Sequence, residues 1–194
     1  MGVDLMTAAA EAQATAPEAR QVALRTFPIP PALVAVLSIG LAAGALIKFD
    51  LSGRSFVAAV FCVVLVVLSA IDIERRIIPN RIVIPASAVV LLGNIAAQPH
   101  RAKEWTIAAF ATMFGAFLIS VAARGGVGMG DVKLAFLLGA GLGWNVVGGL
   151  VLAMIATFVV SLGILARRGL GARKDTIPFG PFLALGALIA LFLS

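Results

Sequence analysis

Long apolar runs alternate with short charged breaks from Pro28 to the end of the chain. A helix that crosses a bilayer needs about 20 apolar residues, and about 17 are tolerated. By this criterion the sequence predicts seven spans, with six to eight compatible with the pattern, near residues 31–47, 55–73, 82–98, 105–123, 132–143, 145–166 and 177–193. We therefore expect an all-α fold, a polytopic transmembrane helix bundle.

The first 27 residues do not share this pattern. They are rich in Ala, Glu and Gln, are mixed in charge, and lack the basic start and apolar middle of a secretory signal. We expect a flexible cytoplasmic tail over residues 1–27 and a transmembrane domain over residues 28–194.

The segment 132–143 is short for a span. Twelve residues rise about 18 Å, whereas the hydrocarbon core is about 30 Å thick. If the segment does span, most basic residues fall on one side of the membrane: Arg20, Arg25, Arg75, Arg76, Arg81, Arg124, Lys133, Arg167, Arg168, Arg173 and Lys174. Only Lys48, Arg54, Arg101 and Lys103 remain on the other side. The positive-inside rule therefore favours a spanning segment, with the basic side in the cytoplasm.

Two further features agree with this topology. Trp105 and Trp144 fall at the opposite interface, where aromatic residues gather, and Gly139, Gly141 and Gly143 permit close helix packing in the short span.

Composition identifies lipid as the main solvent of the chain. Of its 194 residues, 61% are hydrophobic and 12% charged, against about 45–50% and about 25% in soluble domains. This excludes a cytosolic enzyme, and the net charge of +6 is explained by basic loops rather than by nucleic-acid binding. Because Cys62 is the single cysteine, the chain cannot build a disulfide or a cysteine-based zinc site by itself.

Three acidic residues lie at the predicted cytoplasmic membrane edge: Asp72 and Glu74 end the second span, and Asp131 begins the fifth. Ionisable groups in this setting are costly and are candidates for function. For Glu74 we favour the structural explanation, pairing with Arg75 or Arg76. Asp72 and Asp131 end on the same face, as an acid and a base that share a water would.

The residues around both aspartates support this interpretation. Gly128 and Gly130 precede Asp131 and leave room for the backbone of a second polypeptide. After Asp72, Pro79 prevents the helix from continuing, and Asn80 is placed to cap the next helix.

Four sequence segments resemble the type IV prepilin peptidases, membrane aspartyl proteases of the GxGD type. The segments are Ala-Ile-Asp at 70–72, Ile-Pro-Asn at 78–80, Gly-Met-Gly-Asp-Val-Lys-Leu at 128–134 and Ile-Pro-Phe-Gly-Pro-Phe-Leu-Ala at 177–184. The resemblance covers roughly residues 30–194. It implies that Asp72 and Asp131 are the catalytic pair and that no metal or cofactor is needed. Gly128, Gly130, Lys133, Pro79, Asn80, Phe179 and Gly180 become candidates for substrate binding or active-site support.

The same resemblance implies the substrate and the location. The substrate would be the helix of a prepilin or pseudopilin, with a basic leader, a glycine before the cut and a glutamate shortly after it. Its leader would be cut at the cytoplasmic face of the cytoplasmic (inner) membrane.

One departure from the family is visible. Many bacterial members carry two Cys-x-x-Cys pairs that would bind zinc, and they also methylate the new amino terminus. This chain lacks those cysteines and resembles the shorter, peptidase-only members that serve tight-adherence pili. The resemblance therefore gives no support for zinc or for methyl transfer.

Two alternatives stay open at this point. A small transporter or channel subunit also uses intramembrane carboxylates, although its site normally lies near the midplane. Phe179 either contacts the substrate or packs as a wedge at the start of the last helix. Lys133 either favours one ionised state of the aspartate pair or extends to the lipid headgroups.

Overall fold

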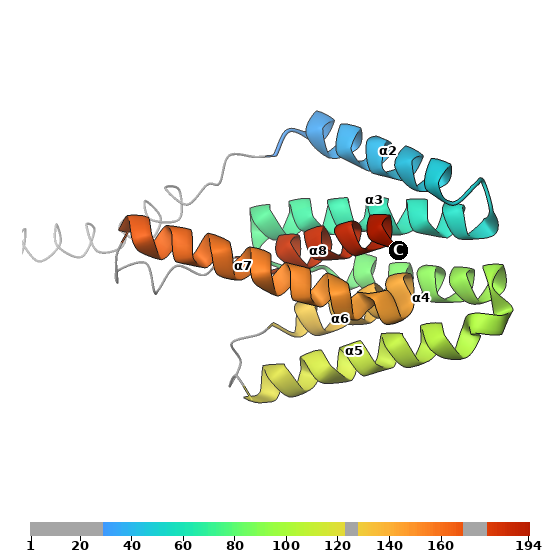
Figure 1. Cartoon of the computed structure of the whole chain (residues 1–194). Helices are drawn as coiled ribbons and strands as arrows, with labels where there is room; N and C mark the ends of the chain where they lie inside the picture. The colour runs from blue at the N-terminus through green and yellow to red at the C-terminus, as the bar shows by residue number, and fades with distance from the viewer. Residues whose placement is uncertain (1–28, 123–127, 169–177) are drawn as a thin grey trace, which may run out of the picture.

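The computed structural model describes residues 29–122, 128–168 and 178–194. Within these ranges the chain forms α-helices and short 3-10 turns and contains no strand: α2 (Pro31–Lys48), α3 (Gly53–Arg75), α4 (Asn80–Ala97), η1 (Pro99–Arg101), α5 (Ala102–Ala122), α6 (Met129–Leu142), η2 (Gly143–Asn145), α7 (Val146–Arg168) and α8 (Gly180–Leu193). The helices run alternately in opposite directions, with α2 and α7 tilted relative to α3 and α4 (Figure 1). The helical bundle predicted from the sequence is confirmed, whereas the expected tail at 1–27 lies outside the described residues.

Five stretches of the described chain are long and apolar enough to cross a membrane: Pro31–Lys48, Gly53–Arg75, Asn80–Ala97, Pro99–Ala122 and Met129–Ile164. The last stretch contains both α6 and α7, and the chain reverses between them at Gly143, whose φ of 58° suits glycine. Together with the large apolar side chains exposed on the outer surface, such as Val36, Ile39 and Phe158, these stretches identify a multi-pass membrane protein. Seven spans remains a prediction.

The two short helices lie inside the bundle. α6 has 14 residues, and nine of them are buried, while α8 also has 14 residues, of which seven are buried. At 1.5 Å per residue each helix is about 21 Å long, well short of the hydrocarbon thickness. The longer helices α3, α5 and α7 pack against them and bury at least half of the residues of each.

Small residues bring the helices close to α6. A Cβ on Gly141 would stand 2.5 Å from the Phe61 ring of α3, and one on Gly139 would overlap Ala108 and Thr112 of α5. Thr112 also donates a hydrogen bond to the carbonyl of Ala135 (3.0 Å). The close packing expected at these glycines is confirmed.

Only one of the two tryptophans is exposed as an interfacial residue should be. Trp144 is 56% exposed, but Trp105 is fully buried. Arg54 and Arg101 lie over the Trp105 ring, with guanidinium carbons 5.8 and 5.0 Å from its centroid. Trp105 therefore lies at the same end of the bundle as Trp144, beside Gly143, but its ring is buried under two cations and the packing of α5 rather than exposed. The place of both rings at a membrane interface stays a prediction.

Candidate active site

Asp72 points into the bundle because it continues the buried face of α3. The buried positions of this helix recur at helical spacing and include Ala58, Cys62, Leu65, Leu68 and then Asp72 itself. The Asp72 side chain is only 5% exposed. The Asp72 carboxylate, at the end of this inward-facing row of residues, is therefore held against the neighbouring helices rather than exposed on the surface of the bundle.

The start of α8 provides the hydrogen-bond partner of Asp72. The Gly180 backbone N–H donates to Asp72 Oδ2 over 3.1 Å. A Cβ on Gly180 would stand 2.6 Å from that oxygen and 3.1 Å from Cγ. Gly180 thus serves as a donor at a distance that only a residue without a side chain permits.

Asp131 lies in the first turn of α6. Its backbone N–H donates to the carbonyl of Gly128 (3.0 Å), the residue that precedes the helix. Asp131 and Asp72 line one cavity of about 300 Å³. The structure therefore brings together two aspartates that are 59 positions apart in sequence.

Other predicted residues lie around the same cavity. Gly128, Gly130, Asn80 and Lys133 line it, and Lys133 Nζ donates to Asn80 Oδ1 over 2.7 Å. Lys133 thus links α6 to the start of α4. Pro79 does not line this cavity, although it directly precedes α4, and Phe179 lines a different, neighbouring cavity beside Asp131.

Two sequence interpretations need correction. Asn80 does not cap α4 with its side chain, because Pro79 holds the N-cap position and the Asn80 amide oxygen accepts from Lys133. Glu74 is exposed and accepts a hydrogen bond from the Ile29 backbone N–H (3.1 Å). Among the described residues Glu74 makes no ion pair with Arg75 or Arg76, and its hydrogen bond instead joins α3 to the residues just before α2.

The structure adds cavity residues that the sequence did not identify. Arg76 adopts a left-handed conformation (φ 53°) that ends α3 and places it on the cavity wall. Ile78 lines the cavity too, and its Cβ lies 3.0 Å from the point where a Cβ of Gly130 would stand. A left-handed arginine has no sequence signature, whereas the glycine at 130 indicated a close approach without naming the partner.

The model of the type IV leader peptidase family matches residues 59–172, which is more than half of the chain and includes both aspartates. The chain belongs to the type IV leader peptidase family. The family resemblance seen in the sequence is confirmed. The matched range stops before α8. The position of Gly180 beside Asp72 in this leader peptidase family member therefore comes from the structure and not from the family match.

Curated relatives carry the name prepilin leader peptidase/N-methyltransferase. The chain is 35% identical to that of Burkholderia pseudomallei strain 1026b over 166 residues, covering 82% of this chain and 53% of the relative. It is 29% identical to that of Bacillus subtilis strain 168 over 170 residues, covering 85% and 66%. This leader peptidase family member spans about half the length of the first of these relatives, and no solved structure matches it.

Proposed function

We propose that this protein is an aspartyl endopeptidase that removes the leader of type IV prepilins or pseudopilins. The observation that carries the proposal is the pair of aspartates on one cavity, one in the last turn of α3 and the other in the first turn of α6. Membership of the leader peptidase family and relatives named prepilin leader peptidase support it. Methyl transfer, which those relatives also have in their name, is not included in the proposal.

The chemistry follows from two neighbouring carboxyl groups. They cannot both ionise at low cost, so the pair shares one proton. The ionised group then takes a proton from a water molecule as the water oxygen attacks the scissile carbonyl. The protonated group polarises that carbonyl and later donates its proton to the leaving amine. This chemistry uses Asp72, Asp131 and water, and no step of it requires a metal.

A transporter is the competing function. The position of Asp72 in the last turn of α3 and of Asp131 in the first turn of α6 favours the protease, because transported ions are normally bound near the midplane. The test is to reconstitute the purified protein in lipid vesicles with a candidate prepilin. Cleavage of the substrate would support the proposal, whereas ion flux without cleavage would support transport.

We further propose that the protein lies in the cytoplasmic (inner) membrane with its amino terminus and both aspartates facing the cytoplasm. In a variant without Cys62, single cysteines at Ser52 and Gln98 should react with an impermeant thiol reagent added to intact cells. Cysteines at positions 126 and 171 should react only after the cells are opened. This expectation rests on the asymmetry of basic residues. Labelling of position 171 from outside would contradict it.

Gly130 is proposed to keep the wall of the cavity open for the substrate backbone. Replacing Gly130 by Val should push against Ile78, which already lies 3.0 Å from the position of a new Cβ. Because both residues line the cavity, a shift of about 1 Å there can cost about 10²-fold in turnover. The measurement is the rate of prepilin cleavage in vesicles.

The matched control for this variant is Gly40→Val in α2, where nothing lies within 4 Å of the new Cβ. Its cleavage rate should stay close to that of the wild type. Equal rates for the two valine variants would mean that Gly130 has no role in admitting substrate.

A further inference from the structure

A second cavity adjoins the aspartate pair. It measures about 400 Å³, its lining is almost entirely apolar, and it is formed by residues of α5, α6, α7 and α8 together with Trp144. We call it the α5–α7 groove. Asp131 lines both this groove and the cavity that holds Asp72. The groove therefore opens directly onto one of the two carboxylates.

The groove begins at the first turns of α6, where Asp131 and Ala135 line it, and includes Trp144, two positions after the last residue of that helix. Between these ends its walls come from α5 and α7. Because α6 is about 21 Å long, an apolar helix lying in the groove from Asp131 to Trp144 would be in contact for about four turns. In Figure 1, α7 crosses the bundle obliquely and α5 lies on the other side of α6, which leaves α6 between them.

The α5 wall of the groove is made largely of small residues: Ala108, Ala111, Thr112, Gly115 and Ala116. Apolar burial gives helices in lipid no reason to associate, so they pair by close van der Waals contact across small side chains. Nothing lies within 4 Å of the point where a Cβ of Gly115 would stand. The wall has the shape that a transmembrane helix needs, and this part of it is unfilled.

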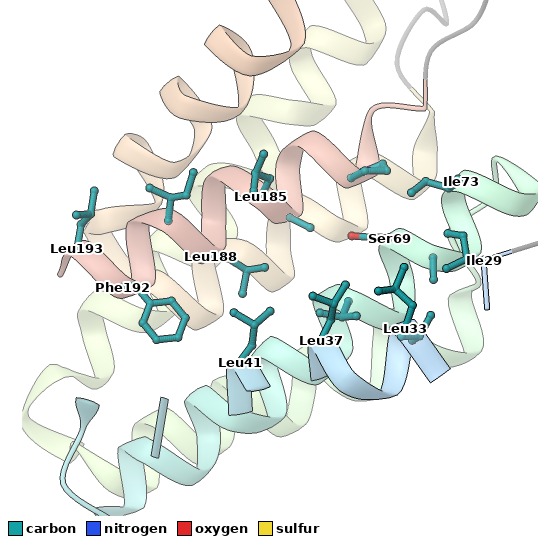
Figure 2. A pocket seen from close by; sticks show the side chains of 16 residues that line it. Ile29, Leu33, Leu37, Leu41, Ser69, Ile73, Leu185, Leu188, Phe192 and Leu193 are labelled. Atoms are coloured by element: carbon teal, nitrogen blue, oxygen red, sulfur yellow. The ribbon is translucent and has the colours of Figure 1, made fainter. Parts of the chain in front are cut away.

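A larger apolar cavity, about 640 Å³, lies between α2, α3 and α8 and does not fit the same role. Figure 2 shows Leu33, Leu37 and Leu41 of α2 facing Leu188 and Phe192 of α8 across it. It meets α3 at Ser69, Ala70 and Ile73, whereas Asp72 is turned toward Gly180. Neither aspartate lines this cavity, so a peptide bound there would not face a carboxylate.

We propose that the α5–α7 groove binds the apolar transmembrane helix of the substrate, with its cytoplasmic end beside Asp131. This assignment rests on the proposed leader-peptidase function. The helix would pack along α6 within the membrane. Its peptide backbone would leave the helical conformation only at the Asp131 end, where the cavity is polar enough to satisfy unpaired backbone groups.

A pair of glycine variants tests the groove. Gly115→Leu fills the groove, whereas Gly148→Leu adds the same side chain to an exposed position of α7 that also has nothing within 4 Å. The loss of packing against a substrate helix predicts a fall in cleavage of about tenfold or more for Gly115→Leu, with Gly148→Leu near the wild-type rate. Ala111→Leu, at an exposed groove position, should behave like Gly115→Leu. Equal rates for all three variants would overturn the assignment.

Cross-linking separates this assignment from the proposed function. In an Asp72→Asn protein without Cys62, a cysteine at Ala111 should cross-link to a cysteine in the apolar helix of an uncleaved prepilin, and a cysteine at Leu37 in the other cavity should not. Cross-links at Leu37 alone, together with normal cleavage by the wild type, would contradict the assignment of the substrate helix to the α5–α7 groove but not the proposed function. Cross-links at Ala111 without any cleavage by the wild type would contradict the function and leave the groove intact.

Discussion

Asp72→Asn and Asp131→Asn should each abolish leader cleavage while the protein still inserts into the membrane. General acid and base catalysis contributes about 10²–10⁴-fold, and either asparagine removes one half of a pair that shares a proton. When residues act as a unit, the losses of activity caused by replacing each of them are not additive. The double variant should therefore be about as inactive as either single variant. The cleavage rate of a prepilin in vesicles, measured for all three variants, checks this expectation.

Glu74→Gln is the matched control for Asp72→Asn. Glu74 lies two residues away on the same helix, but it is exposed and bonded to Ile29 rather than lining the cavity. Its amide variant should retain near-normal turnover. If Glu74→Gln lost activity while Asp72→Asn kept it, the choice of carboxylate would be wrong.

Gly180→Ala should lower activity by about 10²-fold, the cost of a misplacement of about 1 Å at a reacting group. The added methyl group would stand 2.6 Å from Asp72 Oδ2, so the carboxylate must move and its bond from the Gly180 N–H must weaken. Alanine is the better helix former, and Gly180 is the first residue of α8. The fold should therefore tolerate the change that the active site does not.

Two measurements separate these effects. The thermal unfolding midpoint of Gly180→Ala should match that of the wild type, and the cleavage rate should not. Gly40→Ala, at a helical position with open space around it, should leave the cleavage rate unchanged, and it should not lower the midpoint because alanine favours the helix. Normal cleavage by Gly180→Ala would mean that the position of Asp72 against α8 is unimportant for turnover.

Much of the bundle could be predicted from hydropathy because apolar runs and helix length are local properties. The predicted spans 31–47 and 55–73 correspond closely to α2 at Pro31–Lys48 and α3 at Gly53–Arg75. The apolar pattern also separated 132–143 from the segment that follows, and the structure has it as a helix of its own, α6 at Met129–Leu142. The motifs around Asp72 and Asp131 identified the family.

What the sequence did not predict depends on contacts between helices that are distant along the chain. The approach of Gly180 to Asp72 joins residues 108 positions apart, and no local pattern encodes it. Asparagine is a common N-cap residue, but the side-chain oxygen of Asn80 accepts a hydrogen bond from the Lys133 ammonium instead. Trp105 had the position of an interfacial aromatic, but cations from two other segments cover it.

In the proposed function, Asp72 and Asp131 together cut the leader at the membrane edge. Mass spectrometry of a prepilin incubated in vesicles with the wild-type protein shows directly whether they do. We expect one new amino terminus, directly after the leader glycine, formed by the wild type and by Glu74→Gln but by neither Asp72→Asn nor Asp131→Asn. The same product from either asparagine variant, or no product from the wild type, would contradict the account.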